Sequence, residues 1–362
     1  MLCDATMDVH ELAGGVLCTG IPGPRLDPET ASALCRLRPS GVILFRRNFE
    51  CVEQLRELTR ELHGLPSAPL ISIDHEGGKV MRLGAPFTQF PPARRIAATG
   101  EPEMAYAVGR AMAAELALVG IDLSFAPVLD VSSNPQNPVI GERAFGSDTA
   151  GAIAYALPFM RGLQDGGIIP CGKHFPGHGD TDRDSHLELP IVRRPRSELD
   201  AIELAPFRAA IDAGIPALMT AHVVYPTLDE RNPATLSRRI LDDLLRRELG
   251  FTGVIVSDDL QMHALDSQGS VATAALLSLR AGVDWLLICN DFKETLRAAE
   301  AIVTALENGS LDRAMVTAAA TRIRLLPRRP PNTFPTPLPN TDHQALDDRI
   351  RSLTAASERT VG

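Results

Sequence analysis

The chain has 362 residues, of which 44% are hydrophobic, so it can bury a large core in one large domain or two ordinary ones. Its formal net charge of −9 argues against a nucleic-acid-binding surface, which requires a basic patch. No run of about 18 apolar residues is present, so we expect no membrane-spanning helix.

The N-terminus and the cysteines bear on where the protein works. Acidic side chains occupy the first residues, where a secretory signal would place basic ones before an apolar run, so we expect no export signal. The six cysteines form no C-x-x-C pair and are scattered as Cys3, Cys18, Cys35, Cys51, Cys171 and Cys289. This pattern predicts reduced thiols and a cytoplasmic location.

Short apolar, β-branched runs alternate with longer segments of helical period, which is typical of parallel βα units. Eight runs are predicted as strands: 15–19, 41–45, 70–74, 123–130, 168–174, 217–223, 253–258 and 285–290. The predicted helices between them are 52–62, 102–118, 150–164, 198–213, 239–249, 270–281 and 292–308. Eight repeats predict an α/β fold, a single-domain (β/α)8 barrel of the TIM type over residues 1–326. A doubly wound open sheet is the main alternative.

The composition changes after Leu326. Six prolines lie between residues 327 and 339, and a short polar, helix-like segment follows from His343 to Ala356. We therefore interpret residues 327–362 as a Pro-rich tail with a short helix, which wraps the surface or contacts a partner subunit and is not a domain.

Polar residues close most of the predicted strands. They are Asp74, Asp130, Lys173 with His174, His222, Asp258 and Asn290. Barrel enzymes carry their catalytic groups at the C-terminal ends of the strands. The sequence therefore predicts an active site at this rim.

Four segments at the rim carry the candidate chemistry. The run 173–186, KHFPGHGDTDRDSH, brings together three histidines and three aspartates, which suits structural hydrogen bonds, a metal site or acid/base work. The predicted strand at 253–258 ends at two acids, Asp258 and Asp259, which are either functional or cap a helix. Asp74 and Arg82 can bind a sugar or form a salt bridge, and Arg143 is either a ligand or a solvated loop charge.

Together these segments resemble glycoside hydrolase family 3, and within it the bacterial β-N-acetylhexosaminidases. The resemblance covers most of residues 12–326, and the run KHFPGHG followed by DSH is highly specific. It implies Asp258 as nucleophile, His186 as acid/base and Asp184 as the dyad partner of that histidine. The sugar-binding residues that it implies are Asp74, Arg82, Arg143, Lys173 and His174.

The resemblance also implies retaining hydrolysis without cofactor or metal, releasing terminal N-acetylglucosamine from muropeptide fragments during cell-wall recycling. An imidazole acid/base suits neutral pH, because its unperturbed pKa is about 6.5. The departures are modest: Lys79 replaces a more usual Arg, His263 replaces a smaller or acidic residue, and the tail is additional. The second domain of the larger β-glucosidases is not expected, which favours the short hexosaminidase form.

Several alternatives remain open at this point. Within the family these are a β-glucosidase and a phosphorylase that uses phosphate in place of water. Outside it, a non-catalytic sugar-binding barrel is possible, as is a metal-dependent hydrolase using His174, His178, His186 and Asp180. The aglycone is open, and both a monomer and a dimer are compatible with the sequence.

Overall fold

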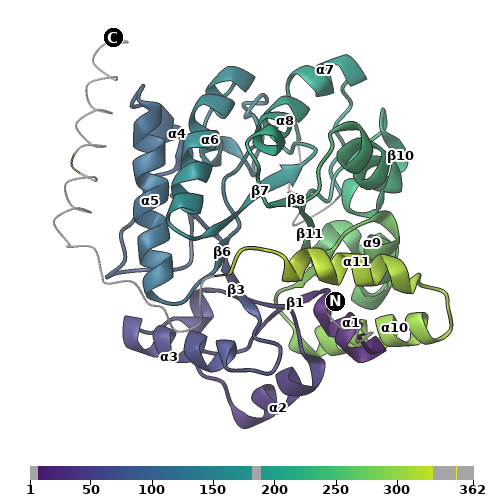
Figure 1. The fold of residues 1–362 in the computed structure, drawn as a ribbon. Coiled ribbons are helices and arrows are strands. Elements are labelled where there is room, and N and C mark those ends of the chain that lie inside the picture. Colours follow the sequence, from purple (N-terminus) through teal and green to yellow (C-terminus); the bar gives the residue numbers. More distant parts are fainter. Residues whose placement is uncertain (1–6, 182–188, 329–347, 349–362) are drawn as a thin grey trace, which may run out of the picture.

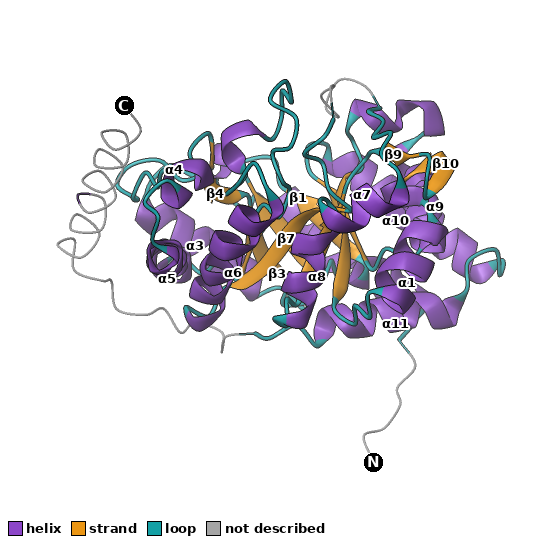
Figure 2. Cartoon of the chain, turned by 90° about the horizontal axis from the view of Figure 1, so that it is seen from above, coloured by secondary structure: helices purple, strands orange, loops and turns teal. Residues whose placement is uncertain are grey.

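The computed structural model describes residues 7–181, 189–328 and residue 348. Eight parallel strands form a closed barrel, and helices surround it (Figures 1 and 2). The strands are β1 (Leu17–Gly20), β2 (Gly41–Leu44), β3 (Leu70–Ile73), β6 (Leu123–Ser124), β7 (Ile169–Phe175), β8 (Ala217–Thr220), β11 (Val254–Asp259) and β12 (Trp285–Ile288). Each pairs with the next along the chain, and β12 pairs with β1. The predicted (β/α)8 fold is confirmed, and the open sheet is wrong.

The larger helices that cover the barrel are α1 (Val9–Gly15), α2 (Pro28–Leu37), α3 (Val52–His63), α5 (Pro102–Leu118), α6 (Thr149–Asp165), α8 (Leu204–Asp212), the π-type helix η4 (Arg239–Glu248), α9 (Val271–Ala281), α10 (Phe292–Glu307) and α11 (Arg313–Arg324). Two shorter helices are α4 (Ala93–Ala97) and α7 (Arg196–Ala201). The segment predicted as one helix over 198–213 is therefore two, α7 and α8. The predicted strand 123–130 is also shorter than expected, since it ends at Ser124.

The strands are buried on both faces, which explains why they appear in the sequence as continuous apolar runs. Their inward side chains fill the barrel, and Trp285 on β12 is fully buried among them. Gly41 at the start of β2 leaves room for that indole, because a Cβ there would lie 2.2 Å from Trp285 Cζ2. The barrel is thus a packed core and not a pore.

The N-terminal end of the barrel is closed by the end of α11 and the chain that follows it. Ile323 and Leu326 belong to the hydrophobic cluster inside the barrel, and Arg328 donates a hydrogen bond to the Ala68 carbonyl oxygen. The opposite end carries two small hairpins, β4 (His75–Gly77) with β5 (Val80–Met81), and β9 (Val224–Tyr225) with β10 (Asp229–Pro233) (Figure 2). The C-terminal rim is therefore the end of the barrel at which side chains can contact a ligand.

Two further predictions bear on the chain as a whole. No helix in the described ranges is both long and apolar enough to span a bilayer. The five cysteines that the structure describes are free thiols. The tail lies almost entirely outside the described residues, so its boundary and its helix stay predictions.

Candidate active site

Side chains from the C-terminal ends of several strands line one pocket of about 110 Å³. The lining residues are Asp74, Glu76, Val80, Arg82, Val139, Arg143, Lys173, His174, His178, Met219 and Asp258. They include every predicted sugar-binding residue and the predicted nucleophile. Of the predicted rim residues, the pocket brings together Asp74, Lys173, His174 and Asp258, whereas its lining does not include Asp130, His222 and Asn290.

Lys173, on β7, is a buried cation held between two carboxylates. Its Nζ lies 2.8 Å from Asp74 Oδ1 and 2.6 Å from Glu76 Oε1, and its side chain is 3% exposed. Burial opposes the charged form, but the two carboxylates outweigh it and raise the pKa of Lys173 above its ordinary value. Lys173 therefore presents a fixed positive charge to the pocket.

Arg143 forms a two-pronged ion pair with the same glutamate. Its Nε lies 2.9 Å from Glu76 Oε2 and its Nη2 lies 2.8 Å from Glu76 Oε1. Burial alone would raise the pKa of Glu76, but Arg143 and Lys173 hold that pKa well below its usual range. Arg143 is thus a buried ligand candidate and not a solvated loop charge. Glu76, which the sequence did not single out, is the residue that orients both cations.

Asp130 fixes the ring of His174. The carboxylate accepts hydrogen bonds from His174 Nδ1 at 2.7 Å and from the backbone amides of His174 and His178 at 3.1 and 2.7 Å. Burial opposes its ionisation, but the two histidines hold the pKa of Asp130 below its ordinary value. Because an ionised carboxylate only accepts, His174 Nδ1 carries the proton, and Nε2 faces Arg143 Nη2 at 3.5 Å.

Asp258 and Asp259 end strand β11 and have different surroundings. Asp258 lines the pocket and accepts a 2.8 Å hydrogen bond from the Asp259 amide. Burial opposes its ionisation, but His222, His174 and Lys173 keep the pKa of Asp258 below its ordinary value. It is therefore an anion at neutral pH.

Asp259 is not among the residues that line the pocket, and it holds neighbouring backbone in place. Its carboxylate accepts hydrogen bonds from the Gln261 amide at 3.1 Å and the Cys289 amide at 3.2 Å, and from Asn290 Nδ2 at 3.1 Å. Burial raises the pKa of Asp259 to about 6. Of the two acids, Asp259 has a structural role, although it does not cap the helix that begins at His263, and Asp258 is available to a ligand.

Asp74 and Arg82 satisfy both interpretations that the sequence left open. Arg82 Nη2 lies 3.4 Å from Asp74 Oδ2, and both side chains line the pocket. The Arg82 guanidinium also lies over the ring of Phe45, 5.6 Å from its centroid. Asp74 and Arg82 therefore pair with each other and also line the space that a ligand would occupy.

The predicted acid/base His186 and its partner Asp184 lie outside the described residues. Of the residues proposed to bind metal, Asp180 is paired with Arg194 at 2.7 Å, and His178 Nδ1 lies 2.9 Å from Thr181 Oγ1. Burial lowers the pKa of His178 to about 4. Within residues 7–181 and 189–328, no three His, Cys, Asp or Glu side chains are grouped to hold a metal ion.

One known family matches most of the chain. The model of the glycosyl hydrolase family 3 N-terminal domain matches residues 10–326. The chain belongs to glycosyl hydrolase family 3. This confirms the family that the motifs predicted.

Individual members of the family agree in both sequence and fold. A β-hexosaminidase of Neisseria meningitidis is 43% identical over 301 residues, covering 80% of this chain and 83% of the relative. The structure of a family 3 β-N-acetylglucosaminidase from Paenibacillus has a TM-score of 0.90 at 34% identity, covering 96% of this chain and 69% of that one. NagZ from Neisseria gonorrhoeae, solved with N-trifluoroacetyl-D-glucosamine, has a TM-score of 0.76 at 36% identity. The match covers 95% of this chain and 98% of that one. These members agree with the predicted enzyme class, whereas the roles of single residues stay predictions.

Proposed function

We propose that this family 3 enzyme is a retaining β-N-acetylhexosaminidase that releases terminal β-linked N-acetylglucosamine. The observation that carries the proposal is the carboxylate of Asp258, which stays ionised and opens onto a pocket walled by fixed hydrogen-bond donors. The names of the relatives, and the sugar bound to the gonococcal neighbour, support N-acetylglucosamine as the released residue.

Asp258 is the proposed nucleophile. Its oxygen forms a bond to the anomeric carbon while the bond to the leaving oxygen breaks, and that oxygen takes a proton from His186. In the second step His186 removes a proton from water, which attacks the anomeric carbon and releases Asp258. Two displacements preserve the β configuration. Asp184 is proposed to orient His186 and to stabilise its protonated form.

Five residues are proposed to hold the sugar. Asp74 accepts from hydroxyl groups, whereas Arg82, Arg143 and Lys173 donate to them, and His174 offers Nε2. The buried carboxylates of Glu76 and Asp130 fix the donors before substrate arrives. Preorganised donors need little rearrangement during the reaction, so they stabilise the transition state efficiently.

The finer parts of the proposal concern the setting of the reaction. We propose a cytoplasmic enzyme acting on muropeptide fragments or chitooligosaccharides, as a monomer or a dimer. The free cysteines and the names of bacterial relatives support this setting.

The test compares aryl β-N-acetylglucosaminide with aryl β-glucoside for the wild type, Asp258→Ala and His186→Ala. We expect the acetamido sugar to be cleaved far faster and both variants to lose activity. A fluorinated N-acetylglucosaminyl donor should add its mass to the peptide that contains Asp258. A label on another side chain, or none, would contradict the mechanism. Faster cleavage of the glucoside would contradict only the substrate.

Two control assays address the remaining alternatives. EDTA should leave the rate unchanged, because the proposed reaction uses no metal. Added phosphate should not yield a sugar 1-phosphate, since water is the proposed acceptor. Loss of activity with EDTA, or formation of the sugar phosphate, would replace the proposal with the metal-dependent hydrolase or the phosphorylase.

A further inference from the structure

The chain between β7 and α7 carries the proposed acid/base, and both of its ends are described. At the start, Asn137 Nδ2 donates to the carbonyl oxygens of His178 and Gly179 at 2.9 and 3.1 Å. At the end, the Val192 amide donates to the Val224 oxygen at 2.9 Å, and the Val224 amide donates to Pro190 at 3.0 Å. Each end is therefore anchored to a different neighbour, one to the loop after β6 and the other to β9.

Arg194 joins the two anchored ends. Its Nη2 donates to Asp180 Oδ1 at 2.7 Å and to Ser133 Oγ at 3.1 Å, and its side chain is 15% exposed. Asp180 precedes the segment 182–188 and Arg194 follows it, while Ser133 lies on the loop after β6. The guanidinium thus connects the end of the segment to its start and to the adjoining loop.

A buried acid also lies beside the same guanidinium. Glu203 is 1% exposed, its Oε1 lies 3.5 Å from Arg194 Nε, and its carboxylate makes no hydrogen bond within the described chain. A Cβ at Gly177 would lie 2.6 Å from Glu203 Cβ, so Glu203 packs directly against the start of the segment. The hydroxyl of Tyr225 donates to the Gly177 carbonyl oxygen. Arg194 therefore has little freedom to move away from Asp180.

We propose that Arg194 is a positioning residue for proton transfer, which sets the spacing of the two chain ends that hold His186. The inference rests on the proposed function, because Arg194 would act through His186 and not on the substrate. A general acid must lie within hydrogen-bond reach of the leaving oxygen. A displacement of about 1 Å can cost about 100-fold in rate.

Leaving groups of different basicity separate this role from a merely structural one. Phenoxide needs protonation as it leaves, whereas 2,4-dinitrophenoxide does not, so only the phenyl glycoside reports on the general acid. For Arg194→Ala we expect kcat/KM to fall about 10- to 100-fold with phenyl β-N-acetylglucosaminide, and less than about threefold with the dinitrophenyl substrate. Arg194→Lys should recover part of the phenyl activity, because it restores the charge opposite Asp180. Equal losses on both substrates, or no loss, would overturn the proposal.

Matched variants keep the result interpretable. Arg196→Ala removes a neighbouring ion pair, with Asp200 at 2.9 Å, and should leave the ratio of the two substrates unchanged. If Arg194→Ala does not fold, Asp180→Asn removes the negative charge from the same ion pair, at a side chain that is 25% exposed. Asp180→Asn must then show the phenyl-selective loss, and its absence would overturn the inference.

His186→Ala separates a failure of the proposed acid/base from a failure of the role proposed for Arg194. It should lose the phenyl substrate selectively. If it does not, the acid/base assignment in the proposed function has failed. If it does while Arg194→Ala and Asp180→Asn do not, the inference on Arg194 alone is wrong.

Discussion

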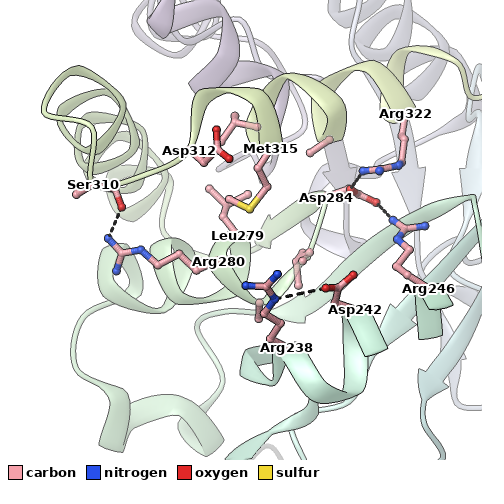
Figure 3. A pocket seen from close by; sticks show the side chains of 15 residues that line it. Arg238, Asp242, Arg246, Leu279, Arg280, Asp284, Ser310, Asp312, Met315 and Arg322 are labelled. Atoms are coloured by element: carbon pink, nitrogen blue, oxygen red, sulfur yellow. Dashed lines mark hydrogen bonds and ion pairs between the residues drawn. The ribbon is translucent and has the colours of Figure 1, made fainter. Parts of the chain in front are cut away.

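Two charge-rich pockets lie at opposite ends of the barrel. The pocket at the N-terminal end has a volume of about 610 Å³ and includes Arg238, Arg246, Arg280 and Arg322 with Asp242, Asp284 and Asp312 (Figure 3). The candidate active site at the C-terminal end measures only about 110 Å³. Neither size nor the number of charges therefore distinguishes a catalytic site from a structural one.

The difference lies in what the buried acid of each pocket contacts. Asp284 receives Arg246 Nη2 at 2.5 Å and Arg322 Nη1 at 2.8 Å, one on each oxygen, together with the Ile255 amide at 2.8 Å. Figure 3 shows it lying between the two guanidiniums. Asp258 instead receives a backbone amide and faces the pocket. The oxygens of Asp284 are thus occupied by arginines that hold the fold together, whereas Asp258 faces a space in which it can act on a ligand.

The largest effect is expected for Asp258→Asn. The amide keeps the shape of the side chain but cannot form the glycosyl ester, so kcat/KM should fall at least about 10⁴-fold. The unfolding midpoint should move little, because the amide keeps the shape of the side chain and can still accept the hydrogen bond from the Asp259 amide. Steady-state rates with aryl N-acetylglucosaminide and a thermal melt measure both quantities. Retention of more than about 1% of the activity would contradict the nucleophile assignment.

Glu76→Gln should damage both activity and stability. The variant leaves Lys173 and Arg143 buried beside a neutral amide, and loss of one partner of a buried ion pair costs about 3–5 kcal/mol. Because the two cations would no longer be fixed, we expect kcat/KM to fall about 100-fold. Urea unfolding and steady-state kinetics measure the two effects. Glu142→Gln is the control, because Glu142 is an exposed acid that directly precedes Arg143. It should change neither the stability nor kcat/KM.

Asp284→Asn should affect stability alone. It weakens the contacts of Arg246 and Arg322, and we expect the free energy of unfolding to fall by about 2–4 kcal/mol. The rate per folded enzyme should stay within about twofold of the wild type, because this pocket is at the far end of the barrel. A large loss of kcat in protein that is still folded would show that the two pockets are coupled and that Asp284 is not purely structural.

The fold was predictable because its main signal is local. Each barrel strand is buried on both faces, so all eight appear as apolar runs, and seven of them lie within a few residues of their true bounds. The regular strand predicted over 123–130 ends at Ser124, but the chain beyond it still pairs irregularly with β7, since Val128 forms an isolated bridge with Lys173 and the Leu129 amide donates to the Lys173 oxygen at 2.7 Å. The predicted helix 198–213 breaks before α8, because Pro206 is incompatible with a helix continuing from Ile202. Helix α2 was missed although Asp27 caps it.

The candidate site was predictable only in part. The strand-end acids and the family motifs identified most residues of the pocket. Glu76 was missed because its partners Arg143 and Lys173 are distant in the chain, and no local pattern shows that they meet. The role of Arg194 depends in the same way on a fold that brings Asp180 and Ser133 together. Long-range pairing of charges therefore marks the limit of inference from the sequence.

The smallest effect, a pH-dependent one, is expected for Glu203→Gln. Burial raises the pKa of Glu203 from 4.5 to about 7 despite the nearby Arg194, while Asp180 and Asp130 add to the rise. Glu198 also approaches that guanidinium, at 3.8 Å, and Tyr225 is buried nearby. Because the folded state binds the proton more tightly, Glu203 contributes its full stability below pH 4.5 and loses it as the pH rises through 7.

Glutamine is neutral at every pH, so the variant should gain stability relative to the wild type between pH 5 and pH 8, by about 1–3 kcal/mol. Urea unfolding at the two pH values measures this difference. Glu198→Gln, an exposed acid near the same guanidinium, should show almost none. An equal difference at both pH values for Glu203→Gln would mean that Glu203 is ionised throughout and fully paired with Arg194. Glu203 would then resemble Asp284, as an acid whose charge is balanced by its arginine, although it lies at the same end of the barrel as Asp258.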